Sequence, residues 1–491
     1  MNFLIVFFCV ITGVITSIWK YSYGIGNHIE QLPIIMRAID NTFLINDFFT
    51  NANSVFGPRL YYAEFIAQLT NFANLHEVFL ILTIISNILI AVVTAFFARE
   101  LFGGNNLTAF AAAGAVMFMK TFWLGSSNTV YRTFLEPQLL ISPLLLGAIW
   151  AGLRNRPVYV AILTGVASLI HSLVGMETGV LILGVLIIQF LLKSKSEINQ
   201  VQRRGDIRNI ILSGLIFGGF SLVSLIPYID ERHIDKLLFI EIVAVFRHPH
   251  HYLPSTFGLE QYLQALLFLI PTGISWYLGN KYILSLNKSK SYLGSLLVFL
   301  VFLCIGGYVF VEIVPSRIWT TAQTFRLLYI MKWLALVLIS GWISYIFSPE
   351  SKNENNQMRL MLVFGLISQL TMAFTFVIYL IKNQFSGNKL NLSRNQVYIV
   401  GLISGGIFII NWLILGAEYR IYAMFILSVF MIWSLYYWKL KWLAIVINIG
   451  LAALSLTFLI VGNFEKSPQF SIKDIRNEKV NIAEFMKNNT P

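Results

Sequence analysis

The sequence has few charged residues and almost no cysteine. Asp, Glu, Lys and Arg make up 12% of its 491 residues, about half the share found in soluble domains. Its two cysteines, Cys9 and Cys304, both lie in apolar stretches, so they indicate neither a disulfide framework nor a thiolate metal site. Walker A, HExxH, GxSxG and GxGxxG motifs are also missing, which removes the usual sequence signals of nucleotide binding, zinc proteolysis and serine hydrolysis.

Long apolar blocks are what the sequence does contain. Hydrophobic residues make up 57% of the chain, and many blocks approach the roughly 20 residues that cross the hydrocarbon core of a bilayer. Lipid offers no hydrogen-bond partners to a backbone, so the blocks predict helices. We therefore expect an all-α polytopic transmembrane bundle of about 13–14 spans in residues 1–462, followed by a polar tail at 463–491. The predicted spans are 2–19, 77–98, 107–123, 134–152, 157–173, 174–192, 209–229, 262–279, 291–313, 326–347, 360–381, 397–416, 421–438 and 442–462.

The net charge of +12 comes largely from short loops between these spans. Lys and Arg collect at 153–157, 193–208 and 280–290, so we expect these loops on the cytoplasmic side and reject nucleic acid as a partner. Loops 20–76 and 230–261 carry more acidic than basic residues and are expected outside. This places the amino terminus inside a bacterial inner membrane, with the first apolar stretch retained as a span and not cleaved as a signal peptide.

The side on which the carboxyl terminus lies depends on the number of spans. Fourteen spans return the tail to the cytoplasm. The basic stretches 382–394 and 439–441 favour thirteen full spans with one re-entrant piece, for which 157–173 and 174–192 are candidates because they are short. We prefer the second arrangement, which leaves the tail outside.

The first external loop is predicted to hold two amphipathic helices. Apolar residues at 29, 32, 36 and 39 follow the spacing of one helical face, which is typical of a helix lying at the membrane surface. Glu30 and Arg37 share another face of that helix. The second helix is expected within 56–69 and carries Arg59, and Asp47 lies between the two helices.

The second external loop contains a cluster of basic and aromatic residues in "VFRHPHHYLPS". Two prolines prevent a regular helix there. The imidazoles could ligate a divalent metal or, together with the arginine, bind a phosphate by charge-assisted hydrogen bonds. A later external stretch adds two more arginines. The residues concerned are Arg247, His248, His250, His251, Tyr252, Arg317 and Arg326.

Acids in one external loop and cations in the others are the combination that group transfer from a phosphate requires. A carboxylate takes the proton of a hydroxyl nucleophile, and cations stabilise the departing phosphate. Glu30 is the first candidate for the base and Asp47 the second. Arg37, Arg59 and the basic cluster are the candidates for substrate and phosphate binding.

This arrangement resembles the GT-C class of membrane glycosyltransferases, in which a carboxylate of the first external loop is the base and the donor is a polyprenyl-phosphate sugar. The runs "NHIEQLPIIMRAID…NDFF", "FLEP" and "RHPHHYLPS" resemble a bacterial family of uncharacterised GT-C-like proteins, best represented in cyanobacteria. The resemblance implies sugar transfer to a glycan, lipid or protein acceptor outside the membrane. It also implies that the family continues beyond "IAEFMKNNTP", where this chain would be truncated. The paired acids of the class are absent, since Glu30 is followed by Gln31 and Asp47 stands alone.

Other interpretations remain open. Asp47 is also a candidate helix N-cap, Arg132 and Glu136 have the spacing of an internal pair, and His171 and Glu177 could be structural. For the whole chain, the alternatives are a transporter or flippase of a lipid-linked saccharide and a non-catalytic assembly protein with the same fold.

Overall fold

The structure is a computed structural model that describes part of the chain. It covers residues 1–385 except 20, 56, 58, 120, 128–129, 193–199, 227–234, 349–358, 360–361, 363–364 and 367–368. The spans predicted at 397–416, 421–438 and 442–462, together with the tail 463–491, lie outside the described residues.

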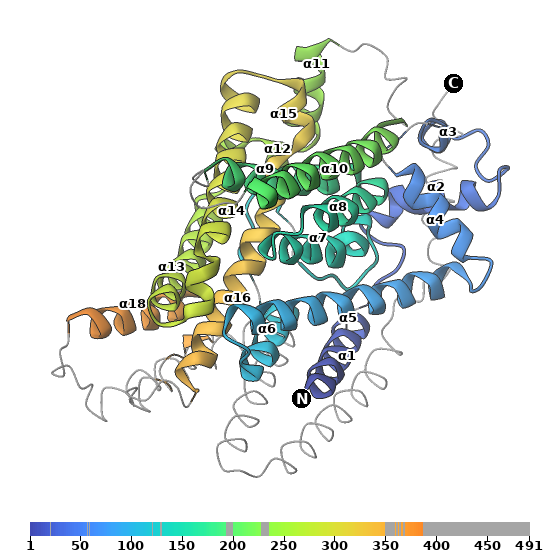
Figure 1. Cartoon of the computed structure of the whole chain (residues 1–491). Helices are drawn as coiled ribbons and strands as arrows, with labels where there is room; N and C mark the ends of the chain where they lie inside the picture. Colours follow the sequence, from blue (N-terminus) through green and yellow to red (C-terminus); the bar gives the residue numbers. More distant parts are fainter. Residues whose placement is uncertain are drawn as a thin grey trace.

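Throughout the described ranges the chain forms helices and turns and no strand (Figure 1). The first half contains α1 (Asn2–Ile18), α2 (His28–Ile39), α3 (Phe48–Val55), α4 (Leu60–Leu69), α5 (Leu75–Leu101), α6 (Asn106–Phe118), α7 (Pro137–Leu153), α8 (Pro157–Ile170), α9 (Ser172–Leu192) and α10 (Gln200–Leu225). The second half contains α11 (Lys236–Ile240), η2 (Glu241–Arg247), α12 (Pro249–Tyr252), η3 (Pro254–Thr256), α13 (Leu259–Tyr282), α14 (Leu284–Tyr308), η4 (Val309–Ile313), α15 (Arg317–Ala322), η5 (Thr324–Leu327), α16 (Leu328–Ile346) and α18 (Gln369–Phe385).

Among the described residues, six helical segments are long and apolar enough to cross a membrane: Leu75–Leu101, Ser172–Leu192, Arg204–Leu225, Leu259–Tyr282, Leu284–Ile313 and Arg317–Ile346. Shorter apolar helices account for the other predicted spans, so every span predicted up to residue 381 overlaps a described helix. The expectation of an all-helical fold is confirmed for the described residues, and the length and composition of the apolar helices indicate a membrane protein.

The core is built around α16, which packs against α13 and α6 and also contacts α5 (Figure 1). Within an 18-residue apolar stretch of the segment Arg317–Ile346, which ends with α16, 94% of residues are buried. This is expected for a helix that is hydrophobic on all sides. Trp333 of α16 donates a hydrogen bond from Nε1 to Thr94 Oγ1 of α5 at 2.9 Å. The Nζ of Lys332 donates to the backbone oxygen of Ser127 at 3.1 Å, which ties the loop after α6 to the core.

Helices α8 and α9 form a tight hairpin that turns at His171. A side chain at Gly175 would place its Cβ 2.4 Å from the backbone nitrogen of Ser168, so only glycine permits this approach. The hairpin thereby fixes the first turns of α9, where Glu177 lies, against the end of α8.

The loops gather at two ends of the bundle. At the Glu30 end, loops 20–76, 119–136, 235–258 and 314–327 contact one another, and hydrogen bonds or ion pairs join Asn27 to Glu136, Glu30 to Arg247, Ser255 to Glu312 and Tyr252 to Gln323. At the Glu100 end, contacts join Asn2 to Arg99, Glu100 to Arg154 and Leu101 to Ser285. The loops predicted to be external therefore share one end, and the loops predicted to be cytoplasmic at 153–157 and 280–290 share the other.

Helix α18 ends at the same end of the bundle as α16. Its Asn383 accepts a hydrogen bond from Tyr282 at 3.4 Å, next to the loop that joins α13 to α14. The ring of Tyr379 lies 6.0 Å from that of Trp342, close to the end of α16. Asn383 therefore lies at the Glu100 end, whereas residues 386–394 of the predicted basic stretch lie outside the described residues.

Candidate functional site at the Glu30 end

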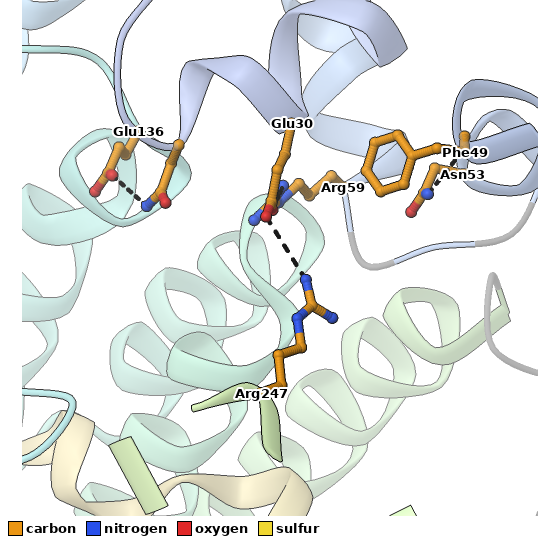
Figure 2. Close-up of polar contacts among 7 residues, drawn as sticks. Glu30, Phe49, Asn53, Arg59, Glu136 and Arg247 are labelled. Atoms are coloured by element: carbon orange, nitrogen blue, oxygen red, sulfur yellow. Dashed lines mark hydrogen bonds and ion pairs between the residues drawn. The ribbon is translucent and has the colours of Figure 1, made fainter. Parts of the chain in front are cut away.

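Glu30 is the point at which the first external loop meets the second. Its Oε2 accepts a hydrogen bond from Nη1 of Arg59 at 2.8 Å, and its Oε1 lies 3.6 Å from Nη2 of Arg247. Figure 2 shows both guanidinium groups beside the carboxylate, with Arg59 directly before α4 and Arg247 at the end of η2. The side chain of Arg247 is 59% exposed and that of Glu30 is 40% exposed, so this pair lies at the surface of the protein.

Helix α2 is held in place by His28, two residues before Glu30. The ring is buried, its Nε2 lies 2.6 Å from the backbone oxygen of Leu135, and its Nδ1 accepts from the amide of Gly24 at 3.0 Å. This network assigns the proton to Nε2. Burial lowers the pKa of His28, although the Leu135 carbonyl and Glu136 partly oppose the shift. Both nitrogens of the neutral ring are used, so His28 positions the helix and takes no part in chemistry.

Two other candidates of the first loop serve local structure. Asp47 accepts a hydrogen bond from the amide of Thr50 at 2.9 Å, which is the N-cap role for α3. Arg37 donates from Nε to the carbonyl of Phe43 at 2.5 Å and from Nη2 to that of Leu44 at 2.6 Å. The partners of Glu30 are thus Arg59 and Arg247, and Arg37 stabilises the turn after α2.

The exposed apolar residues of α2 agree with its predicted amphipathic character. The residues that face the protein are His28, Gln31, Ile34 and Ile35. Ile29 and Ile39, at the two ends of the predicted apolar stripe, are 69% and 44% exposed. These two ends are available to a membrane surface, whereas Leu32 and Met36 between them are half-buried and Leu32 packs against the core.

The three histidines of the second loop form a compact group. One ring nitrogen of each histidine lies within 4.8 Å of those of the other two. Pro249 begins α12 and Pro254 begins η3, so the prolines interrupt the loop as predicted. Burial, followed by Arg247 and His250, lowers the pKa of His248, and burial together with His250, Arg326 and His248 lowers that of His251 to about 4.

The charges around the histidines favour an anion over a metal cation. Three imidazoles supply three of the four ligands of a tetrahedral zinc site. The acid that interacts electrostatically with His248 is Glu30. The guanidinium groups of Arg247 and Arg326 act on the same imidazoles. A positive field of this kind raises the free energy of a bound dication and lowers that of a phosphate.

Arg326 lies at the centre of the charged groups at this end. Its Nε donates to Oε1 of Gln323 at 2.6 Å, and Nε2 of Gln323 donates to the hydroxyl of Tyr252. Gln323 adopts a left-handed conformation with φ of 50°, which costs energy for a residue with a side chain. This strained residue joins the histidine loop to the start of α16.

The remaining sequence candidates have partners other than Glu30. The guanidinium of Arg317 stacks over the ring of Phe239 at 4.7 Å, beside the small apolar cluster formed by α11, η2, α12, η4 and α15. Arg132 and Glu136 form the expected internal pair, with Nη1 2.8 Å from Oε2, and the Glu136 side chain is only 4% exposed. These contacts hold the loops in place.

Glu177 is a residue that sequence reasoning alone assigns to a structural role as readily as to a functional one. Both of its carboxylate oxygens are buried, and neither has a hydrogen-bond partner among the residues that the structure describes. It interacts electrostatically with Arg326. The only sequence signal is an acid within an apolar helix, which marks functional residues in membrane proteins.

A cavity of about 110 Å³ lies at the opposite end, lined by Asn155, Gln189, Asp206 and Asn209 among others. Ligand pockets for drug-sized molecules enclose roughly 300–1,000 Å³, so this space is too small for a lipid-linked sugar. The charged groups at the Glu30 end remain the better candidate site.

Comparison of the chain with protein-family models, with curated proteins and with solved structures found no match.

Proposed function

We propose that this protein is a GT-C-like membrane glycosyltransferase that moves a sugar from a polyprenyl-phosphate donor to an acceptor at the outer face of a bacterial plasma membrane. The observation that carries the proposal is the meeting of Glu30 with Arg59 and Arg247, beside three imidazoles. A carboxylate for the nucleophile and cations for the leaving phosphate are thereby within reach of one substrate.

In this reaction Glu30 takes the proton of the acceptor hydroxyl through Oε1. The acceptor oxygen forms a bond to the anomeric carbon, and the bond from that carbon to the phosphate oxygen breaks. A single displacement inverts the configuration and releases polyprenyl phosphate. Arg247 and Arg326 stabilise the negative charge on the departing phosphate, and neutral imidazoles donate hydrogen bonds to its oxygens.

The membrane supplies the remaining partner. The polyprenyl chain lies among the apolar helices, and the exposed ends of the α2 stripe, Ile29 and Ile39, rest on the outer leaflet. Arg59, directly before α4, holds Glu30 in position and, with Arg247, orients the carboxylate toward the acceptor.

A flippase for a lipid-linked saccharide is the second candidate. One observation favours it: Glu177 and Lys332 are ionisable groups within apolar helices, which are typical of transport pathways. A non-catalytic assembly protein is the third, because Glu30 lacks the second acid of the class. Both alternatives predict donor binding or passage without sugar transfer.

The test is transfer from radiolabelled polyprenyl-phosphate sugars by the purified full-length protein in nanodiscs, with a mixed glycan and lipid acceptor panel. Glu30→Gln should lower transfer by about 100-fold or more, the upper part of the range for a general base, and Arg247→Gln by about tenfold or more. The matched controls are Glu100→Gln and Arg154→Gln, because that pair at the opposite end has similar exposure, 36% and 54%. Equal transfer by wild type and Glu30→Gln would reject Glu30 as the base.

A further inference from the structure

Glu177 of α9 and Arg326 of η5 are an acid and a base on two elements that pack against each other, with the hydroxyl of Thr178 3.0 Å from that of Tyr329. They interact electrostatically, and no direct hydrogen bond joins them among the described residues. The carboxylate of Glu177 has no hydrogen-bond partner in the described part of the chain. Arg326 donates only through Nε, to Gln323, among those same residues. A buried carboxylate without a partner costs several kcal/mol, about 1–3 for each unmet hydrogen bond and more for a charged group. Such a cost is typical of residues that bind a ligand.

The position of Arg326 connects this pair to the Glu30 site. Its charge acts on Glu177, on His248 and His251, and on Tyr252. The side chain is fixed by Gln323, whose left-handed backbone also brings its amide to Tyr252. Glu177 and Arg326 therefore belong to the same polar region as the histidines. Within that region they lie on the side nearer to helices α9 and α16.

A ligand that satisfies both groups must carry an acceptor for the guanidinium and a donor for the carboxylate. Phosphate oxygens accept from two guanidinium nitrogens in a bidentate arrangement. Hydroxyl groups donate to a carboxylate. The ligand class with both features is a phosphodiester that bears free hydroxyls close to the phosphate, such as a polyprenyl-phosphate sugar or the headgroup of phosphatidylglycerol.

We propose that Arg326 and Glu177 form the inner half of the donor site, in which Arg326 binds the phosphate and Glu177 recognises hydroxyl groups of the attached sugar. This inference rests on the proposed function and adds the residue that distinguishes a sugar-bearing donor from a bare lipid phosphate. Glu30 acts on the acceptor, and Glu177 acts on the donor.

The experiment compares binding of three lipids to full-length protein in phosphatidylcholine nanodiscs: undecaprenyl-phosphoglucose, undecaprenyl phosphate and phosphatidylglycerol, with undecaprenyl-phosphomannose as a second sugar. Wild type should bind at least one sugar lipid about tenfold or more tighter than undecaprenyl phosphate, as expected for a site with charged hydrogen bonds to hydroxyls. Glu177→Gln should remove this preference and leave undecaprenyl phosphate binding unchanged. Arg326→Lys should weaken both ligands to a similar extent, because lysine keeps the charge and loses the bidentate geometry.

Folding is controlled by thermal unfolding of each variant. Glu177→Gln replaces an unpartnered buried carboxyl group by an amide of the same shape, so the melting temperature should be unchanged or higher. Glu100→Gln, at the opposite end, is the control for a generic effect of losing one carboxylate and should bind all lipids as wild type does.

The outcomes separate the two proposals. A sugar preference that survives Glu177→Gln overturns the inference and leaves the proposed function standing. Preferential binding of phosphatidylglycerol, lost in Glu177→Gln, supports the ligand chemistry and overturns the proposed donor. A wild-type protein that binds none of the lipids overturns both.

Discussion

The guanidinium of Arg247 lies 3.6 Å from the carboxylate of Glu30, although nearly half of the chain separates the two residues. One belongs to the loop after the first apolar helix and the other to the loop after α10. Their contact brings the acid of the amino-terminal region to the imidazole cluster, and the proposed function depends on this contact. Because the pair is largely exposed, its contribution lies in positioning charge and not in stabilising the fold.

We expect Arg247→Ala and Glu136→Ala to differ sharply in stability. Loss of an exposed pair costs about 0–1 kcal/mol, so Arg247→Ala should barely change the free energy of unfolding. Loss of Glu136 leaves the buried guanidinium of Arg132 without its counter-ion, and this costs about 3–5 kcal/mol. Thermal unfolding in detergent measures both, and similar melting temperatures for the two variants would contradict the assigned burial.

His28→Ala should destabilise the protein by about 2–4 kcal/mol, because the substitution leaves a cavity and two unpaired backbone groups. The ring is lost from a pocket formed by Tyr23, Phe79 and Phe134. His76, whose ring touches Tyr21 and Tyr23 at the surface, is the control, and its alanine variant should cost less than about 1 kcal/mol. A smaller effect for His28→Ala than for His76→Ala would mean that α2 is held by other contacts.

Asp47 should behave as a helix cap and not as a catalytic base. Asp47→Asn keeps an oxygen acceptor for the Thr50 amide, so both stability and sugar transfer should equal those of wild type. Asp47→Ala should cost about 1 kcal/mol by loss of the cap. Transfer assays and unfolding measurements on the same two variants test this role. A loss of transfer in Asp47→Asn would indicate that Asp47 takes part in catalysis.

Stability should fall on acidification, in part through His251. Its pKa is about 4 in the folded protein and about 6.5 in an unfolded chain. Between these values the unfolded state binds more protons, so the free energy of unfolding decreases as pH falls from 6.5 to 4. His251→Gln should reduce the loss of melting temperature between pH 7 and pH 4.5. An identical loss in wild type and variant would show that this imidazole titrates normally.

The two ends of the bundle should lie on opposite sides of the membrane. Phe72, at the Glu30 end, is 88% exposed, and Leu284, at the Glu100 end, is 70% exposed. After Cys9 and Cys304 are replaced by alanine, Phe72→Cys should react with an impermeant maleimide in intact cells, whereas Leu284→Cys and Asn383→Cys should react only after lysis. Labelling of Phe72→Cys and Leu284→Cys from the same side would reject the proposed topology.

The positions of the helices could be predicted closely, because the length of each apolar block determines where its helix begins and ends. The block 77–98 became α5 at Leu75–Leu101, and the amphipathic stretch from residue 29 to 39 became α2 at His28–Ile39. The ends were less accurate where tertiary contacts intervene. The span predicted to reach residue 123 ends as a helix at Phe118, before the loop whose Ser127 binds the buried Lys332 of α16.

The partners within the site could not be predicted. The spacing of Glu30 and Arg37 placed both on one face of a helix, but Arg37 reaches forward to the carbonyls after the helix. In the sequence Arg326 is one of several candidate arginines, and only the structure distinguishes it, by its hydrogen bond to Gln323 and its interaction with Glu177. Hydrogen bonds of this kind join side chains from different loops and leave no periodic pattern in the sequence.

The amino-acid sequence by itself determined that this is a helical membrane protein, because long apolar runs can satisfy their backbone in lipid only as helices. It also marked the two loops that hold most of the candidate residues. Only the tertiary structure decided that Glu30 meets Arg247 and that Glu177 lies near Arg326 without a hydrogen-bond partner. The physical reason is that helix packing, which brings distant loops together, depends on the fit of many side chains at once and not on the order of residues within any one segment.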